Sequence, residues 1–103
     1  MKHLPPTLRE NQRYLRLEIS ADGKKEFKEI VSIVNSAVKE FAGEKGLAEV
    51  SPWLIKRKFD YDQQKVVVRV NRDFESLFRA SIVLSEFKIV TLTVSGTLKS
   101  LES

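Results

Sequence analysis

The stretch WLIKRKFDYDQQKVVVRV, residues 53–70, decides the fold because it predicts two strands joined by a short turn. Residues 53–60 and 65–70 both alternate in side-chain type with a period of two, and three valines fall on one side of the second run. That period is typical of strands with one buried face, and the four residues between the runs suit a turn. The sequence therefore predicts a β-hairpin at the centre of the chain.

A helix is expected on each side of this hairpin. Residues 24–42 carry apolar side chains at helical spacing, and Gly43 and Gly46 are predicted to end that helix before one short helical turn. After the hairpin, Asn71 or Asp73 is predicted to cap the second helix. The apolar stripes are Phe27, Ile30, Val31, Val34, Ala37, Val38 and Phe41 in the first helix, and Phe74, Leu77, Phe78 and Ile82 in the second.

Two further strands complete the pattern. Residues 13–20, RYLRLEIS, and residues 88–95, KIVTLTVS, both alternate with a period of two. Residues 1–12 contain the pair Pro5-Pro6, which favours an extended arm. The sequence therefore predicts an N-terminal arm, residues 1–12, followed by a single domain, residues 13–103.

The order β-α-β-β-α-β predicts an α+β fold of the ferredoxin-like or RRM-like type. Such a fold has a four-stranded antiparallel sheet of strand order 4-1-3-2, with both helices on one face and the other face open. Because both alternate sets in residues 53–60 contain apolar and basic side chains, the facing of that strand could be reversed. The residues expected on the open face are Tyr14, Arg16, Lys56, Lys58, Val67, Arg69, Thr91 and Thr93.

The composition excludes several kinds of site. The 103 residues contain no Cys and one His, which argues against a disulfide scaffold, a thiolate zinc site, a Cys nucleophile and His-based catalysis. Asp60 and Asp62 lie two residues apart, but we interpret them as turn-forming. No apolar run approaches the ~20 residues that span a bilayer, and the N-terminus lacks a signal-peptide core. We therefore expect a cytoplasmic protein with no metal site, no catalytic residue and no membrane partner.

The charge distribution favours a polyanionic partner. The chain contains 18 Lys and Arg and 14 Asp and Glu. The basic excess lies in residues 52–72 rather than in the predicted first helix, where the charges nearly balance. Basic side chains on an open sheet face suit contacts to phosphates, which position a folded RNA without reading its sequence. The two central strands offer only Tyr14 as a stacking aromatic, and residues 65–70 lack the RNP1 pattern, so base-by-base reading is not expected.

Other classes of protein remain open from the residues alone. Residues 43–46 form a GxxG, which in KH domains clamps a nucleic-acid backbone, so a stand-alone KH or RRM module is the main alternative. An acylphosphatase has the same size and fold, but its Gly-rich phosphate loop has no counterpart in residues 20–25. A ligand-sensing domain of the ACT type shares the topology, and no ligand signature distinguishes it here.

Three motifs, spread over most of the chain in the expected order, point to one family. They are residues 4–9, LPPTLR, followed by Arg13-Tyr14; residues 69–72, RVNR, followed by Arg79-Ala80; and residues 94–99, VSGTLK. In these features the chain resembles the archaeal ribonuclease P protein component 2 family, which is shared with a subunit of eukaryotic ribonuclease P and the related MRP ribonuclease.

The resemblance implies a noncatalytic subunit of a ribozyme that removes the 5′ leader from precursor tRNA. The RNA subunit, with bound Mg²⁺, carries the chemistry, so no cofactor is expected on the protein, and its standing as an enzyme stays uncertain. The implied partners are ribonuclease P RNA, precursor tRNA within the complex, and the barrel-shaped ribonuclease P protein component 3. An exposed edge strand also leaves self-association open.

The candidate RNA contacts come from two sources. The first is the family motifs, together with the neighbouring first strand, and the second is charge and strand facing alone. Family motifs and their strands give Arg9, Arg13, Arg16, Arg69 and Arg72, and charge gives Lys56 and Lys58. These cations are expected to lower the repulsion between closely packed phosphates of a folded RNA.

Overall fold

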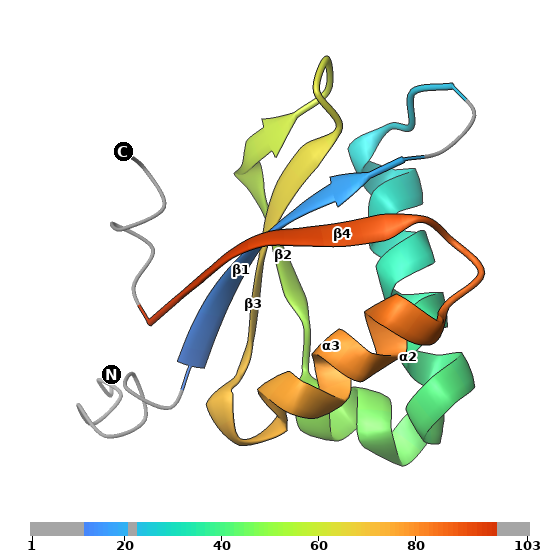
Figure 1. The fold of residues 1–103 in the computed structure, drawn as a ribbon, viewed down its shortest axis with the longest axis vertical. Coiled ribbons are helices and arrows are strands. Elements are labelled where there is room, and N and C mark those ends of the chain that lie inside the picture. Colours follow the sequence, from blue (N-terminus) through green and yellow to red (C-terminus); the bar gives the residue numbers. More distant parts are fainter. Residues whose placement is uncertain (1–11, 21–22, 97–103) are drawn as a thin grey trace, which may run out of the picture.

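The computed structural model describes residues 12–20 and 23–96 and has the predicted order of elements. Its antiparallel sheet has the order β2-β3-β1-β4, and both long helices lie on the same side of it (Figure 1). The elements are β1 (Gln12–Ile19), α2 (Phe27–Val50), β2 (Trp53–Asp60), β3 (Lys65–Asn71), η1 (Arg72–Phe74), α3 (Glu75–Leu84) and β4 (Ile89–Ser95). The predicted fold class and strand order are therefore confirmed. Arg9 and the predicted arm up to residue 11 lie outside the described residues.

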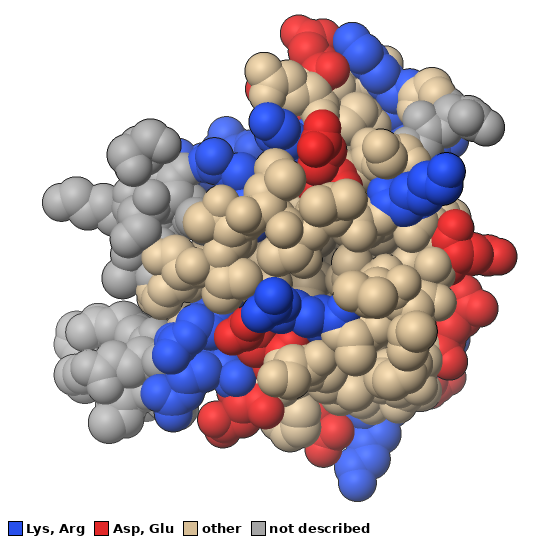
Figure 2. All heavy atoms as spheres, in the orientation of Figure 1, with Lys and Arg blue, Asp and Glu red and all other residues tan. Residues whose placement is uncertain are grey.

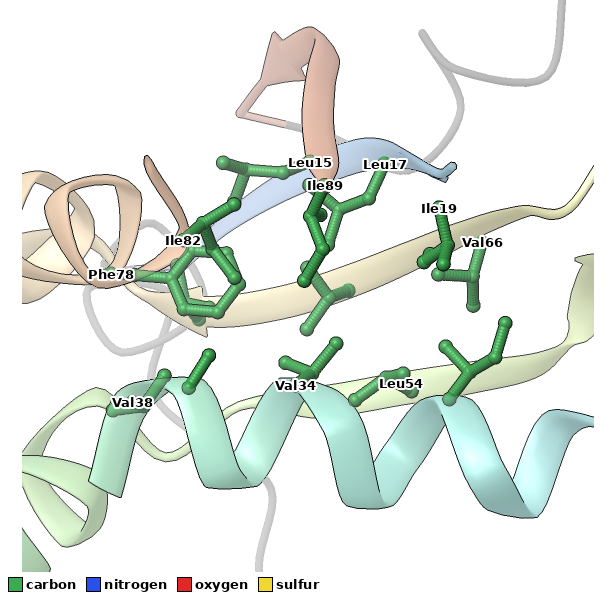
Figure 3. Close-up of a cluster of buried hydrophobic side chains, with 14 of the residues drawn as sticks. Leu15, Leu17, Ile19, Val34, Val38, Leu54, Val66, Phe78, Ile82 and Ile89 are labelled. Atoms are coloured by element: carbon green, nitrogen blue, oxygen red, sulfur yellow. The ribbon is translucent and has the colours of Figure 1, made fainter. Parts of the chain in front are cut away.

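The core lies between the sheet and the two helices. Val34 and Val38 of α2 point toward the sheet, and Phe78 of α3 packs beside them (Figure 3). The sheet contributes the alternate residues of β1 and β3 that the sequence pattern selects, all at most 3% exposed: Leu15, Leu17, Ile19, Val66, Val68 and Val70. Burial of these apolar side chains is the main favourable term in folding.

Helix α2 consists of two helical segments joined by a kink at Gly43. It begins at Phe27, where the backbone N–H of Glu26 donates to the Glu29 carboxylate, and runs to Val50. Gly43 breaks the regular helix with φ 76° and ψ 179°, a conformation that only glycine adopts readily, and the chain then resumes the helix. The prediction that Gly43 ends the first helix and that a helical segment follows is therefore confirmed, whereas the prediction for Gly46 is wrong, because Gly46 lies within the second segment, which packs on the core up to the fully buried Val50.

A buried glutamine ties the turn of the hairpin to the start of α2. Gln64 is 7% exposed, and its Oε1 accepts from the backbone N–H of Lys25 at 2.7 Å. Its Nε2 donates to the carbonyl oxygens of Lys25 at 3.1 Å and Tyr61 at 2.7 Å. The backbone of Gln64 also accepts from Ile19 N–H at 2.9 Å. The side chain and the backbone carbonyl of one residue therefore join the hairpin turn to the start of α2 and to the end of β1.

Asn71 is the cap that precedes the second helical segment. Its side-chain oxygen accepts from the backbone N–H of Asp73 at 3.0 Å, which settles the choice between Asn71 and Asp73. The capped segment is the short η1, and α3 follows directly from Glu75. The chain therefore turns from β3 into the helical layer within a few residues.

Irregular pairing in both edge strands changes the predicted open face. In β2, Trp53, Leu54 and Ile55 pair with Arg69, Val68 and Val67, but the register has shifted by the time Asp60 pairs with Lys65. In β4, a shift lies where Arg16 gives way to Leu17, and it leaves Thr91 opposite Leu17. Residues directly opposite in a pair share a face. Thr91 therefore lies on the helix-covered face, and its predicted place on the open face is wrong.

Candidate nucleic-acid interface

One row of side chains crosses the open face close to the start of β1. Trp53 of β2 pairs with Arg69 of β3, Arg69 pairs with Tyr14 of β1, and Tyr14 pairs with Ser95 of β4. Trp53 is 61% exposed, while Tyr14 and Arg69 are half-buried. We call these four residues the aromatic row. It combines two aromatic rings with a guanidinium between them.

A second row lies beside the first. Ile55, Val67, Arg16 and Thr93 are successive partners across β2, β3, β1 and β4. Val67 is only 2% exposed although it lies on the face without a described helix. Neighbouring side chains therefore cover Val67. The centre of the open face is apolar at this point, and Arg16 lies next to Val67 on β1.

The far end of the same face carries charges of both signs. Lys65 pairs with Glu18 on one side and with Asp60 on the other, so two carboxylates flank one ammonium group. Arg16 and Arg69 are the charged members of the two neighbouring rows. A phosphate chain is therefore attracted more strongly to the end with Arg16 and Arg69 than to the far end, where carboxylates offset the lysines.

The structure separates Arg13 from Arg16 and Arg69. Arg13 pairs with the buried Val70, so it lies on the side of the sheet that faces the helices. Its guanidinium donates to the carbonyl oxygen of Gln12 at 2.9 Å and lies close to Gly96. Arg13 is therefore at the same end of the sheet as the aromatic row but on the opposite face.

Arg72 extends the basic end beyond the strands. It directly follows Asn71, whose partner in the sheet is Gln12, the first described residue of β1. Its Nε lies 3.8 Å from the Asp73 carboxylate, and both side chains are well exposed, so the ion pair contributes little. Its guanidinium therefore remains accessible to an incoming phosphate at this end.

The two lysines predicted on the open face behave differently. Phe59 packs toward α2, with its ring 5.7 Å from that of Phe27, and alternation then places Lys58 on the open side. Leu54 is buried on the helix side, and alternation from Leu54 places the exposed Lys56 on that side as well, at the edge of the sheet. The prediction that both lysines share the open face is therefore wrong for Lys56, because the register shift turns the strand.

Trp53, like Ile55 and Ser95, is a member of this face that the sequence reasoning missed. Leu54 is 7% exposed and packs on the core, so Trp53 and Ile55 must point the other way. The first half of β2 thus has the reversed facing that the sequence left open, and the second half has the expected one. The signal in the sequence was Leu54, an apolar residue that can fill the core and thereby turn Trp53 outward. Trp53 and Ile55, however, form an equally apolar set that could have filled the core instead.

The charges divide between the layers of the molecule. Figure 2 shows acidic side chains along the right edge, where Figure 1 places α2, and clusters of basic side chains at the left edge. Among the described residues, the ion pairs of α2 and α3 are Lys39 with Glu44 at 3.6 Å and Arg79 with Glu75 at 3.2 Å. In each of the two helices, one acidic side chain therefore pairs with a basic side chain of the same helix, which offsets part of the charge of the helical layer.

The GxxG of residues 43–46 does not form a KH-type clamp. Gly43 and Gly46 both lie inside α2, and Gly46 is buried, with a Cβ at this position running into the Ala42 side chain. A nucleic-acid backbone has no access to a buried glycine in the helical layer. The structure therefore removes the observation that favoured the KH alternative.

Two other properties concern the described residues only. No group of three or more His, Asp or Glu side chains there is arranged to hold a metal ion. Over the same ranges, none of the helices is both long and apolar enough for a membrane span.

The fold and the face together define the class: a ferredoxin-like, RRM-like protein that presents arginine and aromatic side chains on an open sheet. Within this class, the chain belongs to the Rpp14/Pop5 family, which its sequence matches over residues 13–103.

Named relatives agree with this assignment. The chain is 41% identical to ribonuclease P protein component 2 of Pyrococcus horikoshii over 99% of this chain and 88% of that protein. It is 42% identical to the protein of the same name from Methanococcus vannielii, over 85% and 65%, and 37% identical to that from Methanocaldococcus jannaschii, over 96% and 75%. The chain therefore spans between about two thirds and nine tenths of these relatives.

A solved structure has the same fold. A chain in the cryo-EM structure of yeast ribonuclease MRP superposes with a TM-score of 0.68 and 18% identity, covering 86% of this chain and 76% of that one. The likeness extends the shared architecture to a distant sequence. It supports the β-α-β-β-α-β arrangement rather than any particular contact.

Proposed function

We propose that this chain is a cytoplasmic RNA-binding protein subunit of ribonuclease P, which supports the catalytic RNA as that RNA removes the 5′ leader from precursor tRNA. The observation that carries the proposal is its membership of the Rpp14/Pop5 family over residues 13–103, with relatives named ribonuclease P protein component 2. The basic end of the open face supplies the physical means.

The proposed action is electrostatic. Arg16, Arg69 and Arg72 lie at one end of the sheet, where Trp53 and Tyr14 are also found. Guanidinium groups hydrogen-bond phosphates in a bidentate manner, and each phosphate neutralised releases counterions. The protein thereby stabilises a compact RNA in which phosphates come close together. The bond cleavage itself belongs to the RNA subunit and its Mg²⁺, and precursor tRNA is the substrate of the complex.

A protein partner is part of the proposal. Large apolar side chains at the C-terminal end of α3 and in β4 are between 41% and 75% exposed: Val83, Leu84, Val90 and Leu92. Figure 2 shows a broad area without charged groups where β4 meets this end of α3. Exposed apolar patches of this kind mark interaction sites. We assign this surface to ribonuclease P protein component 3, and self-association through the β4 edge is the competing occupant.

The test is to recover the tagged protein from its own cells under mild salt and to assay the recovered complex on precursor tRNA. We expect one abundant structured RNA, a second protein of the barrel type, and cleavage at the 5′ leader. A broad mixture of RNAs without cleavage would instead identify a stand-alone RRM-type binder. Recovery without RNA would overturn the proposal.

A further inference from the structure

The aromatic row of the open face goes beyond phosphate contacts. Trp53 and Tyr14 flank Arg69 across three neighbouring strands. We infer that this row binds an unpaired segment of RNA, with one base stacked on each ring and Arg69 contacting the phosphate between them. The inference rests on the proposed function and specifies which part of an RNA the open face takes.

The exposure of Trp53 calls for a partner. Its side chain is 61% exposed at the start of an edge strand. In the described part of the chain, the ring contacts join Phe27, Phe59 and Tyr61, and Trp53 takes part in none of them. A large ring left in water gains by covering its face, and every base offers a flat surface to do so.

The geometry of the sheet selects unpaired RNA. Neighbouring strands lie ~4.8 Å apart, so the strands that carry Trp53 and Tyr14 are on the order of 10 Å apart, with Arg69 between them. Successive bases in a duplex strand rise by only ~3.4 Å. Two bases that stack on both rings must therefore be splayed apart, which only an unpaired segment allows.

The charges select the same end of the face. Arg69 lies within the row, Arg16 lies in the next row, and Arg72 lies beyond the strand ends. At the other end, Glu18 and Asp60 flank Lys65 and offset its attraction for phosphates. A nucleic-acid chain of any length is thus held at the aromatic row rather than spread over the whole sheet.

The chain carries its own reporter for this contact. Trp53 is the single tryptophan, so its emission can be followed without labelling. We would titrate the protein with an oligouridylate of about eight nucleotides, a length within known single-strand site sizes. A self-complementary RNA hairpin with a stem rich in G–C pairs and a short loop serves as the duplex control. Stacking on Trp53 should quench its emission with the single strand and much less with the duplex.

Three variants assign the effect to the row. Tyr14→Ala keeps the reporter, and Trp53→Ala is followed by the anisotropy of a labelled oligouridylate. Loss of one stacking ring should weaken binding by about 5- to 150-fold. Tyr61→Ala is the matched control, because Tyr61 is 42% exposed near the far end of the same hairpin. It should bind as the wild type does, and thermal unfolding of all three checks that they fold.

The outcomes separate this inference from the proposed function. Quenching by the single strand, lost in Tyr14→Ala and retained in Tyr61→Ala, supports the aromatic row as the site. A wild-type protein that supports cleavage by the catalytic RNA, while oligouridylate leaves the Trp53 emission unchanged, overturns the inference alone. A protein that neither binds the catalytic RNA nor alters its cleavage overturns both.

Discussion

Strand β3 has two faces with opposite properties. On one face, Val66, Val68 and Val70 are at most 1% exposed beneath the helices, and on the other face Arg69 lies between Trp53 and Tyr14. Successive residues of one strand thus serve the core and the candidate interface in turn. Under the proposed function, stability and RNA binding in this domain therefore depend on separate residue sets, although members of the two sets are neighbours in the sequence.

The largest expected effect comes from the helix-covered face. Phe78 is fully buried in α3 and is the largest fully buried side chain. Replacing it in Phe78→Ala should lower the free energy of unfolding by about 3–5 kcal/mol, measured by urea titration, because a cavity remains in a close-packed core. A loss below about 1 kcal/mol would contradict the assignment of the core. Any molecules that remain folded should bind RNA normally, since the open face is unchanged.

The next effect breaks the open face. Arg16→Ala combined with Arg69→Ala should weaken binding to the catalytic RNA by about 1.5–3 kcal/mol, or roughly 10- to 150-fold, because charge-assisted hydrogen bonds to phosphates are lost. The free energy of unfolding should change by less than about 1 kcal/mol. Filter binding over a range of salt concentrations measures the first quantity, and urea titration measures the second.

A matched pair of changes in the helical layer controls for net charge. Lys39→Ala combined with Arg79→Ala removes the same two charges from side chains that are 56% and 52% exposed on α2 and α3. That variant should keep most of the RNA affinity. Equal losses in the two double variants would show that affinity follows total charge rather than the position of the arginines.

A smaller effect is expected at Gln64, which joins the hairpin turn of the sheet to the start of α2. Gln64→Ala removes two hydrogen bonds to the backbone of Lys25, which join the hairpin turn to the start of α2, and one to Tyr61 within the turn. The backbone groups of Lys25 and Tyr61 lose their partner, so we expect the free energy of unfolding to fall by about 1–3 kcal/mol in thermal or urea unfolding. Gln63→Ala, at the exposed neighbouring position, should change stability by less than about 0.5 kcal/mol.

The smallest effect sharpens the contrast within the open face. Glu18→Gln removes a carboxylate at the far end of that face, and RNA affinity should rise by about 0.2–1 kcal/mol at low ionic strength. The gain should disappear at high salt because screening removes long-range repulsion. Glu44→Gln, on an 83% exposed side chain of α2, makes the same charge change away from the sheet. If both variants gain equally, the two ends of the open face do not differ as argued.

The sequence predicted the helix-covered face well. Leu15, Leu17 and Ile19 in β1 follow period two, and the stripe of α2 with Val34 and Val38 follows the helical period. In both elements one set of residues is apolar and the other polar, so burial leaves a single choice. The same clarity fixed the facing of Arg16 and Arg69, which follow from their neighbours in β1 and β3.

The sequence failed where two choices have similar energies. Gly46 was predicted to help end the first helix, yet it lies within the second segment of α2, which the packing of Val50 holds against the core. In β2, Leu54 and Ile55 are equally able to fill the core, so alternation alone could not choose between them. A shift of one residue exchanges the two faces of a strand. The same error therefore left Trp53 out of the open face and put Lys56 into it.

By itself, the sequence determined the order of the elements and the side of each central strand that is buried, because local periodicity decides both. The sheet topology then followed from the order of the elements. Only the tertiary structure decided that Trp53 meets Arg69 and Tyr14 in one row. Pairing with β3 and packing of Leu54 on the core set the register of β2, and the energies that set it come from residues distant in the chain. The residue pattern of an edge strand carries no record of those contacts.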